Sequence, residues 1–328
     1  MMVRVKNPHS KSLGLKTPLL LVIFLIGAGL LFLYTQRIKW QLPVAEVPYT
    51  AVSTPPLSPQ AAEERRQLNL QESKTLQVIK VEGVERSYVL HVPENYDRTA
   101  KIGVVFAFHG RGNTGPEMEE ITQLSGLADQ KNFLVVYPTG LNQRFVFSDK
   151  PDTESGDVAF TKQILSELAG RYNLDTQHVF ALGFSNGGFF VYHLACEQPE
   201  LFAGFATVGA SLPEKVLNTC QPLTARPMLM ILGTDDPFMD YALSDTTGTI
   251  IPIQQTLKKW TTLNKCQGEP EVFKGAISVT SYSECEQGSV VGLITLQGVD
   301  HTWIIGRNDT EFDTSRTIID FFSSVSSL

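Results

Sequence analysis

The stretch HVFALGFSNGGFFVYHLACE, residues 178–197, decides the fold of this chain. Its first five residues are mostly apolar, as in a buried strand, and residues 187–196 form an apolar helical segment. Gly183-Phe184-Ser185-Asn186-Gly187 lies between them and matches the pattern G-x-S-x-G. A serine at so sharp a turn has a strained backbone, and the flanking glycines remove Cβ atoms that would clash there. The Ser185 hydroxyl then stands above the sheet at the positive end of a helix, so Ser185 is the candidate nucleophile.

Strands and helices alternate on both sides of this motif. Gly103–Phe108 and Phe133–Tyr137 are unbroken apolar runs, as expected for strands covered on both faces. Further strands are predicted over Leu76–Val81, Ser87–Val92, His178–Leu182, Phe205–Val208, Met228–Leu232 and near 277–282 and 290–296, and helices over Pro116–Gln130, Val158–Arg171, Gly187–Cys196, Ile253–Leu263 and Glu311–Ser323. This order predicts an α/β fold with a mostly parallel, doubly wound sheet and helices on both faces.

A serine nucleophile needs a base, and His301 is the candidate. Of the six histidines, only His301 lies more than one helix length downstream of Ser185. It stands in the segment GVDHTW, after an apolar strand and before the last predicted helix. A loop in that position can bring an imidazole beside the serine.

The base needs a carboxylate that orients it, and the loop Gly233–Pro237 supplies two. Asp235 and Asp236 stand in the loop that begins at Gly233, directly after the predicted strand Met228–Leu232. Neighbours on an extended segment point in opposite directions, so only one of them can reach His301. Asp240 and Asp245 are weaker alternatives further along the chain.

Two backbone N–H groups are expected to form an oxyanion hole. One belongs to Asn186, the residue after the nucleophile, and the other to Arg111 in the loop His109-Gly110-Arg111-Gly112. His109 and Gly110 in this loop, and Trp303 near His301, are the candidate substrate-binding residues.

The charge of the chain is unevenly distributed. The 328 residues carry a net charge of −7, yet six of the 27 basic and none of the 34 acidic side chains lie in the first forty residues. The rest of the chain is therefore strongly acidic. An acidic body argues against nucleic acid as a partner, because phosphate backbones are bound through Lys and Arg.

The N-terminal sequence predicts a membrane anchor. TPLLLVIFLIGAGLLFLY, residues 17–34, is free of charge and would span about 27 Å as a helix. The positive-inside rule puts residues 1–16 in the cytosol. We expect a single transmembrane signal anchor over 17–36, with the catalytic domain periplasmic or extracellular. Secretion after signal cleavage is the alternative, although no A-x-A-like site follows the apolar run.

The remaining sequence divides into a linker and one large domain. Residues 41–62 contain five prolines and are expected to be an extended spacer. Residues 63–328 are expected to form the catalytic domain. The four cysteines all lie in that domain, and an even count outside the cytosol suggests disulfides. We expect the nearest partners to pair, as Cys196–Cys220 and Cys266–Cys285.

Several of these segments together resemble a known group of esterases. Most of residues 86–305 is similar to polyhydroxybutyrate depolymerase-like, feruloyl and acetylxylan esterases. The segments that carry the similarity are RYNLDTQHVFALGFSNGGFFVYHLACEQPELFAGFA, FHGRG, YPTGLNQ, GTDDP and DHTW. The resemblance implies an α/β-hydrolase fold and a secreted carboxylic-ester hydrolase. The G-T-x-D pattern of the group falls on Gly233, Thr234 and Asp236, which implies Asp236 as the acid. Arg111 stands where members often have Cys, and Asp300 replaces the usual Gly.

We therefore expect a serine esterase with a Ser185–His301–Asp236 triad and an acyl-enzyme intermediate. Its substrates would be small or polysaccharide-linked esters with feruloyl, acetyl or hydroxyalkanoate groups. No cofactor and no metal are expected. A peptidase or other acyl hydrolase on the same fold, and a catalytically silent binding module, are the alternatives.

Overall fold

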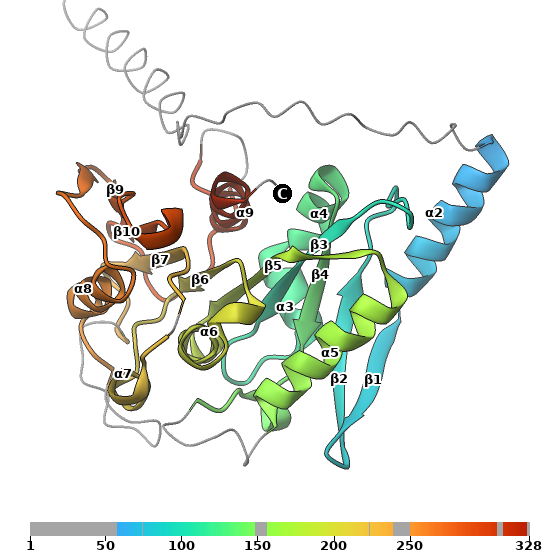
Figure 1. Cartoon of the computed structure of the whole chain (residues 1–328), viewed down its shortest axis with the longest axis horizontal. Helices are drawn as coiled ribbons and strands as arrows, with labels where there is room; N and C mark the ends of the chain where they lie inside the picture. The colour runs from blue at the N-terminus through green and yellow to red at the C-terminus, as the bar shows by residue number, and fades with distance from the viewer. Residues whose placement is uncertain are drawn as a thin grey trace, which may run out of the picture. The chain divides into compact units, whose positions relative to one another are not determined.

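The apolar runs of the sequence pair into one mixed sheet. The structure, a computed structural model, describes residues 58–73, 75–147, 156–222, 224–238, 250–306 and 311–326. Within them the sheet has the strand order β1-β2-β4-β3-β5-β6-β7-β10-β9-β8 (Figure 1). The strands are β1 (Leu76–Val81), β2 (Val84–His91), β3 (Ile102–Phe108), β4 (Phe133–Pro138), β5 (Leu174–Phe184), β6 (Gly204–Val208), β7 (Met228–Gly233), β8 (Glu271–Phe273), β9 (Ile277–Tyr282) and β10 (Val291–Leu296).

The centre of the sheet is parallel and its two ends are antiparallel. Strands β4, β3, β5, β6, β7 and β10 run parallel, as the apolar runs predicted. The β1–β2 hairpin and strands β9 and β8 add antiparallel pairs at the ends. The carboxyl ends of the parallel strands therefore meet at one edge, where ligands bind in open α/β sheets.

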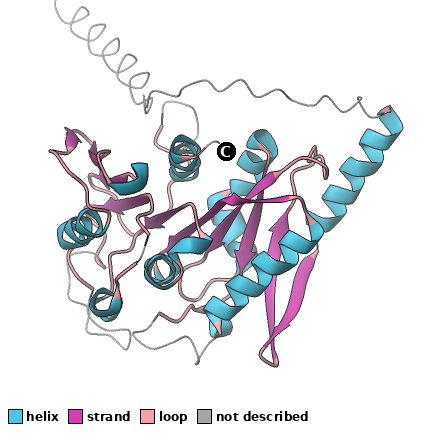
Figure 2. Ribbon diagram, viewed as in Figure 1, coloured by secondary structure: helices cyan, strands magenta, loops and turns pink. Residues whose placement is uncertain are grey.

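Helices cover both faces of the sheet (Figure 2). They are α2 (Pro59–Ser73), α3 (Gly115–Thr122), α4 (Leu124–Lys131), α5 (Asp157–Arg171), α6 (Asn186–Glu197), α7 (Glu214–Thr219), α8 (Ile253–Leu263) and α9 (Thr314–Val325), with 3₁₀ turns η1 (Leu141–Gln143), η2 (Pro199–Leu201) and η3 (Glu286–Gly288). Phe190 of α6 packs against Phe108 of β3, whereas Phe322 of α9 stacks on Phe180 of β5. Phe180 is in register with Val105, which faces the side opposite Phe108, so α6 and α9 cover opposite faces.

Several predicted elements differ from the structure. The helix predicted over Pro116–Gln130 is two helices, α3 and α4, because Gln123 between them has a left-handed φ of 51° and ends α3. Strand β5 begins at Leu174, four residues before its predicted start. The last four residues of the expected spacer, 59–62, form the first turn of α2 instead of extended chain.

Helix α2 escaped prediction because its sequence is polar on every side. Polar contacts attach it to the domain: the Asn69 side chain is buried and its Nδ2 donates to the carbonyls of Pro93, Glu94 and Tyr96. A buried amide is favourable when it is hydrogen-bonded in this way. Hydrophobic periodicity therefore gave no signal for this helix.

The expected N-terminal segments lie largely outside the described residues. These are the cytosolic tail 1–16, the membrane anchor 17–36 and residues 41–57 of the spacer. Within the part of the chain that the structure describes, no helix is long and apolar enough to span a bilayer.

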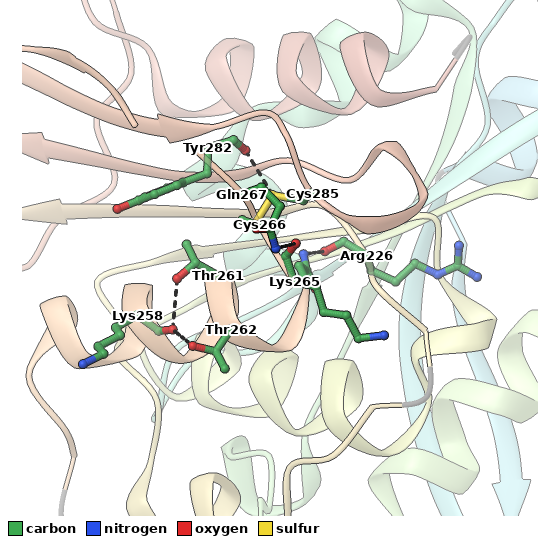
Figure 3. Close-up of a disulfide and its surroundings, with 10 residues drawn as sticks. Arg226, Lys258, Thr261, Thr262, Lys265, Cys266, Gln267, Tyr282 and Cys285 are labelled. Atoms are coloured by element: carbon green, nitrogen blue, oxygen red, sulfur yellow. Dashed lines mark hydrogen bonds between the residues drawn. A yellow bond between two sulfur atoms is a disulfide. The ribbon is translucent and has the colours of Figure 1, made fainter. Parts of the chain in front are cut away.

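Both expected disulfides are confirmed. Cys196, near the end of α6, bonds Cys220, which follows α7. Cys266, after α8, bonds Cys285 in the segment between β9 and β10 (Figure 3). Around the second bond, the Gln267 backbone N–H donates to Glu284 O at 2.7 Å. This disulfide ties α8 to the chain that leads into β10, the strand before His301.

Candidate active site

Ser185 occupies the strained turn that its sequence motif predicts. It follows β5 and precedes α6, with φ 52° and ψ −116°, a conformation that costs a non-glycine residue about 1–3 kcal/mol. A Cβ on Gly183 would lie 2.2 Å from Gly187 O, and a Cβ on Gly187 would lie 2.1 Å from Phe108 O. Only glycine fits at these two positions, and the turn is fixed by this close approach of three backbone segments.

His301 and Asp236 form a pair at the carboxyl ends of neighbouring strands. The Nδ1 atom of His301 lies 2.7 Å from Oδ2 of Asp236, whose side chain is almost fully buried. Asp236 follows β7 and His301 follows β10, and these two strands are parallel neighbours. The adjacent Asp235 is exposed, so of these two neighbouring carboxylates Asp236 is the one that contacts His301.

Backbone contacts hold the Asp236 and His301 loops against each other. The Asp235 N–H donates to Val299 O at 2.9 Å, and the Gly298 N–H donates to Thr234 Oγ1 at 2.9 Å. A Cβ on Gly233 would lie 2.0 Å from Val299 O. The spacing between carboxylate and imidazole is therefore set by the backbone as well as by their own hydrogen bond.

Phe184 and Gly209 place the imidazole near the serine turn. The Phe184 ring, from the residue before Ser185, stacks on His301 with centroids 4.9 Å apart. A Cβ on Gly209 would lie 3.0 Å from Cε1 of His301, and the preceding Val208 O accepts from the Ser185 N–H at 2.9 Å. Among the described residues, Nε2 of His301 has no hydrogen-bond partner, so the serine–histidine bond is not formed in this structure. In enzymes without substrate such bonds are often long and tighten in the complex.

The predicted oxyanion loop lies against the serine. A Cβ on Gly110 would be 3.5 Å from Ser185 Cβ, so glycine lets this backbone approach Ser185. Gly110 O accepts from His109 Nδ1 at 2.7 Å. The carbonyl and N–H of one trans peptide point in opposite directions, so this bond also fixes the direction of the Arg111 N–H.

His109 is an interior support of that loop. Its ring is fully buried, and its Nε2 accepts from the Gly140 N–H at 2.9 Å while its Nδ1–H donates to Gly110 O. These roles require the neutral ring, and burial lowers the pKa of His109 below its usual value. With both nitrogens engaged and no exposed surface, the ring offers no face to a substrate.

Asn186 has a second role that the sequence did not reveal. Its side chain makes a reciprocal pair with Phe145, whose N–H donates to Oδ1 at 2.8 Å and whose carbonyl accepts from Nδ2 at 3.1 Å. The Phe145 ring in turn packs on His109 with centroids 4.6 Å apart. Asn186 and His109 are thus joined through Phe145. No motif signals this, because Phe145 lies 41 residues before Asn186.

A buried ion pair fixes the segment that contains Phe145. Arg86 bonds Asp157, and both side chains are buried. Asp157 Oδ2 accepts from the Val146 N–H at 2.9 Å, and Arg86 donates to Thr139 O at 3.4 Å. Strand β2 and helix α5 therefore hold both ends of the loop that lies beside Asn186 and His109.

Trp303 is also an interior residue. It is 7% exposed, and its Nε1–H donates to Ser315 Oγ at 3.0 Å. Its ring meets Phe184 edge-on, with centroids 6.2 Å apart. Trp303 thus lies behind the ring that supports His301 and has little surface for a substrate.

In the described residues, no group of three or more His, Cys, Asp or Glu side chains is arranged to hold a metal ion.

Solved structures identify the class of fold. The chain is similar to the acetyl xylan esterase from Aspergillus awamori, with a TM-score of 0.57 and 18% identity over 76% of this chain and 99% of that chain. It is also similar to an S-formylglutathione hydrolase from Agrobacterium tumefaciens, with a TM-score of 0.50 and 13% identity over 76% and 95% of the two chains. These similarities and the sheet topology show the α/β-hydrolase fold.

Sequence comparison identifies the family. The model of the Esterase family, described as "Putative esterase", matches residues 81–281. The chain is 28% identical over 283 residues to "Putative esterase NocK" of Nocardia uniformis subsp. tsuyamanensis, covering 75% of this chain and 82% of that protein. It is 26% identical over 242 residues to feruloyl esterase D of Neurospora crassa, covering 67% and 75%. It spans 31% of feruloyl esterase B of Piromyces equi. The chain belongs to this esterase family.

Proposed function

We propose that this esterase is a serine carboxylic-ester hydrolase with Ser185 as nucleophile, His301 as general base and Asp236 as the carboxylate that orients the base. The observation that carries the proposal is the 2.7 Å contact between His301 Nδ1 and Asp236, made at the sheet edge where the Ser185 turn also lies. The three residues follow β5, β7 and β10, which are parallel strands whose carboxyl ends lie at one edge of the sheet.

The geometry supports acyl transfer in two halves. The Ser185 hydroxyl attacks the ester carbonyl while its proton passes to Nε2 of His301, and Asp236 stabilises the imidazolium through Nδ1. The backbone N–H groups of Asn186 and Arg111 donate to the oxyanion, and each such donor stabilises the transition state by about 2.7–4 kcal/mol. His301 then protonates the leaving alcohol. Water deprotonated by His301 attacks the acyl-enzyme, the acid leaves, and Ser185 regains its proton.

The relatives support a substrate in which an acyl group is linked to a small alcohol or a polysaccharide. Their names include feruloyl esterase and acetyl xylan esterase. We propose feruloyl, acetyl or hydroxyalkanoate esters as the acyl class. A panel of these esters, compared by kcat/KM on the same preparation, separates the three.

We further propose that the catalytic domain lies outside the cytosol and is held at the membrane by residues 17–36. Two disulfides favour an oxidising compartment. Alkaline extraction of membranes tests the anchor: the full-length chain should remain in the pellet. Release of a shorter protein that begins after residue 36 would instead establish a cleaved signal.

Active-site labelling tests the triad directly. A fluorophosphonate probe should label the wild-type protein, and Ser185→Ala should abolish both labelling and ester turnover. Ser323→Ala is the matched control, because among the described residues that hydroxyl bonds only Ile319 O within α9, and it should behave as wild type. Full turnover in Ser185→Ala would refute the assignment.

A further inference from the structure

An exposed aromatic ring lies directly beside His301. The Phe238 side chain is 44% exposed, and its ring centroid is 4.8 Å from that of His301, with the planes at 65°. The other exposed large apolar side chains of the described residues lie on α2, β1, β2, β8 and β9: Leu68, Leu76, Val78, Val84, Val272, Phe273 and Ile277. Of the exposed large apolar side chains in the described residues, only Phe238 belongs to the loop that carries Asp236.

The position of Phe238 is tied to the Asp236 carboxylate. The Phe238 N–H donates to Asp236 Oδ1 at 2.9 Å, while Oδ2 of the same group bonds His301. The imidazole also stacks on Phe184. His301 therefore contacts two aromatic rings, and the Phe238 ring is the one turned to solvent.

The order of the strands puts the residues expected to contact the ester carbonyl and those expected to contact the alcohol on opposite sides of β5. The oxyanion loop follows β3, on one side of β5, whereas Asp236, Phe238 and His301 follow β7 and β10, on the other. In the proposed reaction the leaving alcohol receives its proton from His301, so its oxygen must come within about 3 Å of the imidazole. The carbon attached to that oxygen then lies within reach of the Phe238 ring.

We propose that Phe238 forms a subsite for the alcohol part of the ester, and that it selects alcohols carrying a six-membered ring with a flat apolar face. An exposed phenyl ring gains most from such a face by stacking or edge contact. This inference rests on the proposed triad, because it assigns the alcohol to the His301 side. Sequence analysis did not single out Phe238, since its contact with His301 spans two loops.

Two substrate series test the subsite. The first keeps the acetyl group and varies the alcohol: methyl, cyclohexylmethyl and benzyl acetate, whose alkoxide leaving groups have similar basicity. The second keeps methanol and varies the acid: methyl acetate, methyl butanoate and methyl 3-phenylpropanoate. The measured quantity is kcat/KM, because it reports acylation, the half-reaction that contains the alcohol.

Phe238→Ala should lower the preference for benzyl and cyclohexylmethyl acetate over methyl acetate by about 3- to 10-fold. The preferences within the acyl series should stay as in wild type. The preference of Phe238→Leu for benzyl and cyclohexylmethyl acetate over methyl acetate should lie between those of wild type and Phe238→Ala. Phe273→Ala removes a ring of similar exposure, 45%, from β8 at the far edge of the sheet, and should leave both series unchanged.

The opposing outcomes are distinct. An equal loss on all acetates in Phe238→Ala would make Phe238 a support for His301 and overturn the subsite, as would an unchanged alcohol preference. Absence of both turnover and fluorophosphonate labelling in wild type would refute the proposed function itself, and the subsite with it.

Discussion

The strained backbone of Ser185 makes a prediction about stability that is independent of any substrate. Its φ of 52° and ψ of −116° are unfavourable for a residue with a Cβ and accessible to glycine. Ser185→Ala and Ser185→Gly both remove the hydroxyl, but only Ser185→Gly removes the Cβ. The difference in stability between these two variants therefore isolates the strain.

The expected magnitude follows from two opposing terms. Relief of the strain is worth about 1–3 kcal/mol, and the extra freedom of glycine in the unfolded chain costs about 0.4–1 kcal/mol. Ser185→Gly should thus be more stable than Ser185→Ala by up to about 2.6 kcal/mol, with a midpoint of about 1.3 kcal/mol. For a domain of this size each kcal/mol raises Tm by about 2–4 °C.

Urea unfolding followed by tryptophan fluorescence measures the difference, since Trp260 and Trp303 are both buried. Ala276→Gly, an exposed position without a positive φ, is the matched control. The free energy of unfolding of Ala276→Gly should fall by about 0.4–1 kcal/mol, the usual cost of replacing alanine by glycine. If Ser185→Gly were less stable than Ser185→Ala by a similar amount, the strain argument would be refuted.

Three further predictions concern the site and its supports. Asp236→Asn should lower kcat by about 10⁴-fold because the imidazole loses its orienting acceptor, whereas the exposed Asp235→Asn should change kcat little; equal effects in steady-state assays would contradict the pairing. Burial lowers the pKa of His109 in the folded protein, so this imidazole is protonated more readily in the unfolded chain. The free energy of unfolding of wild type should therefore fall as pH drops below about 6.5, by at most about 1.4 kcal/mol per pH unit. Denaturant curves for His109→Asn should lack this pH-dependent loss of stability. Replacing Cys266 and Cys285 together by Ser opens a 19-residue link and should cost about 3 kcal/mol of unfolding free energy; unchanged denaturant midpoints would show that the bond adds no stability.

Much of the fold follows from local pattern. The apolar runs of β3 and β4 and the strand–serine–helix segment around Ser185 are readable because buried parallel strands and tight turns constrain residue type position by position. Helix α2 and the break at Gln123 are not readable in this way. The first depends on side-chain bonds from Asn69 to another loop, and the second on a single left-handed residue.

The candidate site divides along the same line. Ser185 and His301 could be chosen from motif and order along the chain, since a nucleophile turn and a late histidine have few alternatives in this sequence. The choice between Asp235 and Asp236 could not be made from spacing alone, because adjacent residues differ only in direction. The buried positions of His109 and Trp303 were likewise invisible, although both residue types suit a binding site equally well.

The sequence by itself determined that this chain builds a mostly parallel sheet with a serine at a strained turn, because those features depend on residues that are neighbours in the chain. Only the tertiary structure shows the contact between Asp236 and His301, the link that Phe145 makes from Asn186 to His109, and the position of Phe238 beside the imidazole. Each of these contacts joins loops from different strands, so its geometry is set by the order and register of the sheet.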